Sequence, residues 1–116
     1  MDVNILVVED IEENRYALKS QLEEYKDDIM VFLASNGEDA LRTVLSEPID
    51  IIILDIQMPG MDGFELLEQL RSKPETQDAP VLVLTAKELT KADLSKLRRN
   101  NVKQLITKGS LNRDEL

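Results

Sequence analysis

The sequence of 116 residues contains no cysteine and no histidine. Without cysteine, the chain forms no disulfides and offers no thiolate ligands to a metal. Without histidine, it cannot hold a Ser-His-Asp triad, an imidazole zinc site or a phosphohistidine of its own. Chemistry on these side chains therefore depends on carboxylates, hydroxyls and lysines.

Aromatic residues and positive charge are also scarce. The core must be built from Ile, Leu and Val, because the only aromatic residues are Tyr16, Tyr25, Phe32 and Phe64. The 14 basic and 23 acidic residues give a net charge of −9, which repels phosphate backbones and anionic lipid. No apolar run has the length of a membrane span or signal peptide. We expect one domain over residues 1–116, a cytoplasmic location, and no direct binding to nucleic acid or membranes.

Two periodicities alternate along the chain. Five almost continuously apolar runs are too short for helices and are typical of strands covered on both faces; they are 4–8, 30–34, 51–54, 81–84 and 104–106. Between them, apolar residues recur at helical spacing, and N-cap residues with an acid three positions later mark helix starts at Asn36, Thr90 and Asn112. The alternation predicts an α/β fold with a doubly wound, five-stranded parallel sheet and helices on both faces.

Polar residues stand at the carboxyl ends of four predicted strands. In open parallel sheets, ligands bind at this edge, where the strand order reverses. If the first and third strands are neighbours, three carboxylates, a hydroxyl and an ammonium group meet there. They belong to Glu9 and Asp10 after the first strand, Asp55 after the third, Thr85 after the fourth and Lys108 after the fifth.

Three clustered carboxylates raise one another's pKa unless a cation lies between them. Oxygen ligands without sulfur or imidazole favour a hard ion, and a small carboxylate set with room for water and phosphate oxygens favours Mg²⁺ over Ca²⁺. A carboxylate beside Mg²⁺, with Lys108 and Thr85 facing it, has the groups needed to accept a phosphoryl group.

Each of these residues also has an ordinary structural explanation when it is taken alone. An Asp after a strand, such as Asp55, is commonly an Asx-turn or cap residue. Glu9 and Asp10 suit a solvated loop before a helix N-terminus. Thr85 and Lys108 are unremarkable as a strand-end residue and a surface lysine. Their joint placement at corresponding strand ends favours a site.

The segments ILVVEDIEENR, DIQMPGMDGFELL, VLVLTAK and ITKGS resemble the receiver domains of two-component response regulators and hybrid histidine kinases, over essentially the whole chain. The resemblance implies a flavodoxin-like fold with strand order 2-1-3-4-5. It also implies a role for each site residue: Asp55 as phosphoacceptor, Asp10 and Asp55 as direct Mg²⁺ ligands, Glu9 as a ligand through water, the backbone carbonyl of Gln57 as a further ligand, and Thr85 and Lys108 as groups that bind phosphoryl oxygens.

The reaction that the resemblance implies is transfer of a phosphoryl group from a phosphohistidine to Asp55, followed by hydrolysis of the acyl phosphate. The donor is a histidine kinase or a histidine phosphotransfer domain, because this sequence has no histidine. Such a chain is not a conventional enzyme, although it assists its own phosphorylation. Phosphorylation then switches the surface around the fourth helix, the fifth strand and the helix that follows.

Two positions depart from the family pattern. Leu105 stands where an aromatic switch residue is usual, and a leucine cannot swing a ring between exposed and buried states. Gly109 follows the lysine where a proline with a cis bond is usual, and a cis bond before glycine would cost about 3 kcal/mol. Both departures are closer to receivers attached to hybrid kinases than to stand-alone regulators. The sequence stops about one turn into the helix predicted from Asn112, so we expect concentration-dependent self-association through uncovered apolar surface.

Three other functions compete with this interpretation. A flavin-binding electron carrier needs phosphate-binding hydroxyls and N–H groups in its first loop, which here reads EDIEEN. An aspartate-dependent phosphohydrolase typically has a second acid two residues after the nucleophile, where this sequence has Gln57. A pseudo-receiver that binds proteins without being phosphorylated stays open because of Leu105 and Gly109.

Overall fold

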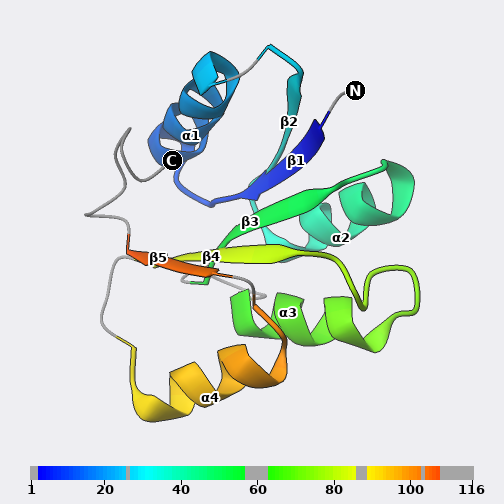
Figure 1. The fold of residues 1–116 in the computed structure, drawn as a ribbon, viewed down its shortest axis with the longest axis vertical. Coiled ribbons are helices and arrows are strands. Elements are labelled where there is room, and N and C mark those ends of the chain that lie inside the picture. The colour runs from blue at the N-terminus through cyan, green and yellow to red at the C-terminus, as the bar shows by residue number, and fades with distance from the viewer. Residues whose placement is uncertain (1–2, 26, 57–62, 86–88, 103, 108–116) are drawn as a thin grey trace.

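Helices and strands alternate along the chain in the computed structural model (Figure 1). The structure describes residues 3–25, 27–56, 63–85, 89–102 and 104–107, with only the backbone of Thr85 and of 104–107. Gln57, Lys108, Gly109 and the helix predicted from Asn112 lie outside these residues. The described elements are β1 (Val3–Val8), α1 (Glu12–Tyr25), β2 (Ile29–Ala34), α2 (Gly37–Ser46), β3 (Ile51–Asp55), α3 (Gly63–Ser72), β4 (Val81–Thr85), α4 (Lys91–Arg99) and β5 (Gln104–Thr107).

The strands form one parallel sheet in the order β2-β1-β3-β4-β5. The predicted order of the first four strands is confirmed, and the backbone of β5 lies beside β4 as expected. Strand ends differ by a residue from the prediction, so that Asp55 and Thr85 are the last residues of β3 and β4. Because β1 has β2 on one side and β3 on the other, the order reverses next to β1, which is where this sheet type binds ligands.

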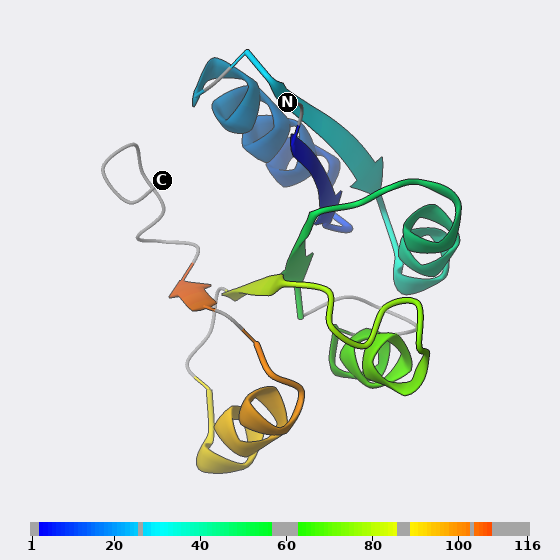
Figure 2. The ribbon, with the colours of Figure 1, turned by 45° about the vertical axis from the view of Figure 1, so that its right-hand side comes forward.

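The two faces of the sheet carry separate apolar cores. Successive strand residues point to opposite faces. One core packs the strands against α2, α3 and α4, and the other packs them against α1 (Figure 2). The first core includes Leu6, Val8, Ile52, Leu54, Leu66 and Leu97, and the second includes Ile5, Val7, Leu18, Leu22 and Ile53. This confirms a doubly wound arrangement with helices on both faces.

The prediction that all strands are covered on both faces is wrong for β2. Its residue Met30 is 51% exposed. The reason is position, because β2 has a neighbouring strand, β1, on one side only. An apolar run cannot reveal that a strand lies at a sheet edge.

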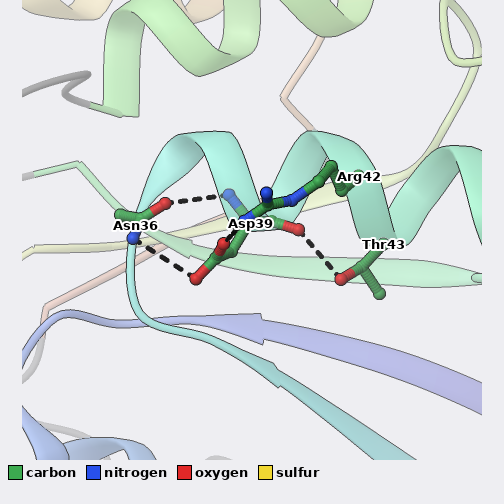
Figure 3. Close-up of polar contacts among 4 residues, drawn as sticks. All are labelled: Asn36, Asp39, Arg42 and Thr43. Atoms are coloured by element: carbon green, nitrogen blue, oxygen red, sulfur yellow. Dashed lines mark hydrogen bonds and ion pairs between the residues drawn. The ribbon is translucent and has the colours of Figure 1, made fainter.

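Local capping sets the helix starts that the structure describes. At α2, Asn36 Oδ1 accepts the amide of Asp39 at 2.8 Å, and Thr43 Oγ1 donates to the Asp39 carbonyl at 2.9 Å (Figure 3). The Asp39 carboxylate accepts from the Asn36 side-chain amide and pairs with Arg42. At α4, Thr90 and Asp93 form a reciprocal capping box. The predicted N-caps Asn36 and Thr90 are therefore confirmed.

At the amino ends of β4 and β5, Arg71 of α3 joins the two loops that precede these strands. Its guanidinium donates hydrogen bonds to five backbone carbonyls, those of Thr76, Gln77, Ala79, Asn100 and Asn101, at 2.7–3.3 Å. The pKa of Arg71 is lowered by its burial, and the negative charge of nearby Asp78 opposes this shift without reversing it.

Among the described helices, none combines the length and the apolar character needed to cross a membrane.

Candidate metal centre

The register of the central strands brings two acids together. Val8 of β1 pairs with Leu54 of β3, so the next residues, Glu9 and Asp55, leave the same edge of the sheet side by side. On its other side, Asp55 pairs with Leu84 of β4. The apolar runs that bury β1 and β3 therefore also carry these carboxylates to one place.

Three carboxylates meet at this edge. Each of Glu9, Asp10 and Asp55 offers an oxygen, and these oxygens all lie within 4.8 Å of one another. Glu9 is fully buried, Asp55 is 1% exposed and Asp10 is half-buried. Carboxylates on ordinary loops are solvated, so acids buried together in this way need a compensating charge.

The backbone of Glu9 is held on both sides. Its amide donates to the Ala34 carbonyl of β2 at 3.0 Å, and its carbonyl accepts a hydrogen bond from Arg15 Nη1 at 2.8 Å. The side chain is also oriented, because Oε1 accepts the amide of Ile11 at 3.2 Å. The first acid of the cluster is thus fixed in position by three elements, β2, the loop after β1, and α1.

The donor set fits a hard divalent cation. All three groups are carboxylates, which is the ligand type that Mg²⁺ prefers. Asp10 Oδ1 is buried and has no hydrogen-bond partner within the described part of the chain. A buried carboxylate oxygen without a donor is costly, and a cation at this position would satisfy it. The residues present therefore fit a magnesium ion.

The other predicted site residues lie partly outside the described structure. The backbone of Thr85 ends β4, one residue beyond the partner of Asp55, and pairs with Thr107, the residue before Lys108. Strands β4 and β5 thus end at the same edge of the sheet as the three acids. The side chain of Thr85, together with Gln57 and Lys108, falls outside the described residues, so their predicted roles stay predictions.

Two residues next to the acids are not among the predicted site residues. Arg15 reaches back to the carbonyl of Glu9, and Gly63 packs against Ile56, the residue after Asp55. A signal for Arg15 was present, since a basic residue in the first turns of α1 opposes the preference for acids there. Gly63 at the start of a helix gave a weaker signal, because glycine is common near helix ends.

Comparison with known proteins gives one family. The family described as "Response regulator receiver domain" matches residues 5–116. Response regulator PleD of Caulobacter vibrioides is 42% identical over 87 residues, which are 74% of this chain and 18% of PleD. This chain thus spans less than a fifth of that relative.

Solved structures agree on the fold. The N-terminal domain of a response regulator receiver protein from Methanoculleus marisnigri is 34% identical, with a TM-score of 0.82 over 92% of this chain and 85% of that one. The receiver domain of sensor histidine kinase PA1611 from Pseudomonas aeruginosa is 24% identical, with a TM-score of 0.84 over 99% and 91%. That protein has a magnesium ion coordinated in its active site cleft.

The family match spans almost the whole sequence, and the fold and the acidic cluster at the sheet edge agree with it. This chain belongs to the response regulator receiver domain family of two-component signalling proteins.

Proposed function

We propose that Asp55 accepts a phosphoryl group from a phosphohistidine on a partner protein in a Mg²⁺-dependent reaction. The observation that carries the proposal is the meeting of Glu9, Asp10 and Asp55 within 4.8 Å at the carboxyl edge of the sheet. Asp55 ends the central strand β3, and it is the one acid of the three whose backbone belongs to a strand. This placement gives the nucleophile a rigid support.

The metal would be held by carboxylate oxygens of Asp10 and Asp55, by Glu9 through water, and by the carbonyl of Gln57. The Gln57 ligand rests on the family resemblance, and the magnesium ion in the PA1611 receiver supports the site as a whole. When bound, Mg²⁺ neutralises the clustered carboxylates and the oxygens of an incoming phosphoryl group.

The protein's own part in the reaction is nucleophilic. A carboxylate oxygen of Asp55 attacks phosphorus, an O–P bond forms as the N–P bond breaks, and the electron pair stays on the departing imidazole nitrogen. Thr85 and Lys108 bind the phosphoryl oxygens and stabilise their charge. Water later hydrolyses the acyl phosphate, which returns the carboxylate and releases inorganic phosphate. Phosphorylation switches the protein-binding surface around α4 and β5.

The donor is a histidine kinase or a histidine phosphotransfer domain, since this sequence has no histidine. We place the chain either in a hybrid histidine kinase or in a larger response regulator. The similarity to the receiver domain of sensor histidine kinase PA1611 supports the first, and the match to 18% of response regulator PleD supports the second. As a member of the receiver family, the chain would act in the cytoplasm.

The test is intact-mass spectrometry after incubation with Mg²⁺ and acetyl phosphate, a small phosphodonor. We expect one phosphoryl adduct on the wild-type protein and none after EDTA treatment or in Asp55→Asn. Asp27→Asn, a change of the same kind at an exposed residue, is the control and keeps the adduct. A folded wild-type protein that takes up no phosphoryl group from acetyl phosphate or from a phosphorylated kinase would instead be a pseudo-receiver that binds partners without phosphorylation.

A further inference from the structure

Arg15 lies on α1 and reaches back to the backbone of the acidic loop. Its Nη1 donates to the carbonyl oxygen of Glu9 at 2.8 Å and to that of Asp10 at 3.5 Å. The first is a strong charge-assisted hydrogen bond, and the second is at the limit of one. One guanidinium nitrogen thus contacts the main chain of both acids that precede α1.

These contacts belong to a closed ring of hydrogen bonds. Glu9 Oε1 accepts the amide of Ile11 at 3.2 Å, and the carbonyl of Ile11 accepts the amide of Arg15 at 2.9 Å. The Arg15 side chain then returns to the Glu9 carbonyl. Because the ring contains both the carboxylate and the carbonyl of Glu9, it fixes the direction of the side chain as well as the path of the loop.

The hydrogen-bond acceptors of the Arg15 side chain are carbonyls, and its guanidinium carbon also lies 5.8 Å from the centroid of the Tyr16 ring. Within the part of the chain that the structure describes, its guanidinium forms no ion pair with a carboxylate. A guanidinium that paired with Asp10 or Asp55 would compete with a metal ion for the same oxygens. By binding the main chain instead, Arg15 does not compete with a cation for those oxygens.

We propose that Arg15 is a positioning residue for the metal centre: it holds the loop of Glu9 and Asp10 in the conformation that binds Mg²⁺. The proposal rests on the metal site of the proposed function. Arg15 contacts neither the metal nor the phosphoryl group in this proposal. It acts through the backbone of Glu9 and Asp10.

The direction of the effect separates positioning from simple electrostatics. Removing a positive charge near a cation site would, by charge alone, tighten Mg²⁺ binding. Removing a support of the ligands weakens binding, typically by tenfold to a hundredfold for outer partners of metal ligands. We therefore expect Arg15→Met to weaken Mg²⁺ binding by about tenfold or more, against the electrostatic trend.

The experiment is calorimetric titration of the metal-free protein with Mg²⁺, which requires no phosphorylation. Arg15→Lys keeps a charged donor but not the planar fork, so we expect it to bind Mg²⁺ more weakly than the wild type and more tightly than Arg15→Met. Arg42→Met is the matched control, because it removes the same charge from an exposed position on α2, and its affinity should stay within about twofold of wild type. Amide hydrogen exchange at Ile11 should be faster in Arg15→Met.

Affinity equal to or tighter than wild type in a folded Arg15→Met protein would overturn the proposal. If that variant does not fold, Arg15→Gln is titrated in its place under the same criterion. The wild-type phosphorylation assay separates this failure from failure of the proposed function. Wild-type protein that is phosphorylated, with unimpaired Mg²⁺ binding in Arg15→Met, disproves the role of Arg15 alone. Wild-type protein that binds Mg²⁺ and is never phosphorylated disproves the proposed function alone.

Discussion

The amide nitrogen of Gly63 donates a hydrogen bond to the carbonyl oxygen of Ile56 at 3.3 Å, so the first residue of α3 lies against the residue after Asp55. A Cβ atom at Gly63 would lie 2.2 Å from Ile56 Cα and 2.8 Å from Ile56 Cβ. These are far inside van der Waals contact, and the first is with backbone. Position 63 therefore requires glycine because of a close approach between chain segments.

Gly63→Ala should affect both stability and the metal site. The added methyl group must push Ile56 away, which we expect to cost about 1–3 kcal/mol of unfolding free energy. Because Ile56 adjoins Asp55, Mg²⁺ affinity should fall as well. Urea unfolding and Mg²⁺ titration measure the two effects. Glu68→Ala, at an exposed position on the same helix, is the control. If Gly63→Ala is as stable as wild type, α3 can shift away from Ile56 without cost, and position 63 does not require glycine.

Asp10→Ala should weaken Mg²⁺ binding by more than about tenfold, because it removes a proposed direct ligand. The metal-free protein should be as stable as wild type or more stable, since two clustered carboxylates repel less than three. Thermal unfolding with and without Mg²⁺ shows both effects, and wild type should gain more from the metal than the variant does. Equal gains in the two proteins would remove Asp10 from the metal site.

Asn36→Ala tests local stability apart from function. The variant loses the hydrogen bond that the Asp39 amide donates to Asn36 Oδ1, which we expect to cost about 1 kcal/mol. Mg²⁺ affinity should not change. Arg42→Met, which breaks the exposed pair with Asp39, should cost less than about 0.5 kcal/mol. A larger loss in Arg42→Met than in Asn36→Ala, by urea unfolding, would contradict this ranking.

Arg71→Met should destabilise the protein more than the loss of the exposed pair of Arg42 does. It leaves five backbone carbonyls, in the loops before β4 and β5, without their shared donor, at an expected cost of about 1.5–3 kcal/mol. Arg71→Lys should restore only part of this, because one ammonium group cannot span both loops. Chemical denaturation measures the cost, and Arg99→Met, an exposed arginine on α4, is the control. Full stability in Arg71→Lys would refute the need for the planar group.

The elements were predictable because their signals are local. An apolar run of five residues and a cap such as Thr90 act within a few positions of the chain, and the structure has them where the sequence predicts them. The exposure of Met30 was not predictable in the same way. It depends on which strand lies at the edge of the sheet, and that follows from the packing of the whole chain.

The acidic cluster was predictable because parallel strands end at a common edge, so that Glu9 and Asp55 meet once β1 and β3 are neighbours. What the supporting residues contact was not predictable, although Arg15 stands out in the sequence as a basic residue near the start of α1. Arg15 acts on backbone carbonyls whose direction is set only when α1 packs on the sheet, and Gly63 acts through the close return of the chain to Ile56. Side chains that bind main-chain atoms have no partner residue type to reveal them.

The most direct test is to locate the modified residue. The protein is incubated with Mg²⁺ and a phosphohistidine donor, the acyl phosphate is reduced with borohydride, and the resulting homoserine is mapped by peptide mass spectrometry. We expect homoserine at Asp55 and nowhere else, with none formed when Mg²⁺ is removed. Homoserine at Glu9, Asp10 or another acid, or equal labelling of Asp55 without Mg²⁺, would contradict Mg²⁺-dependent phosphorylation of Asp55.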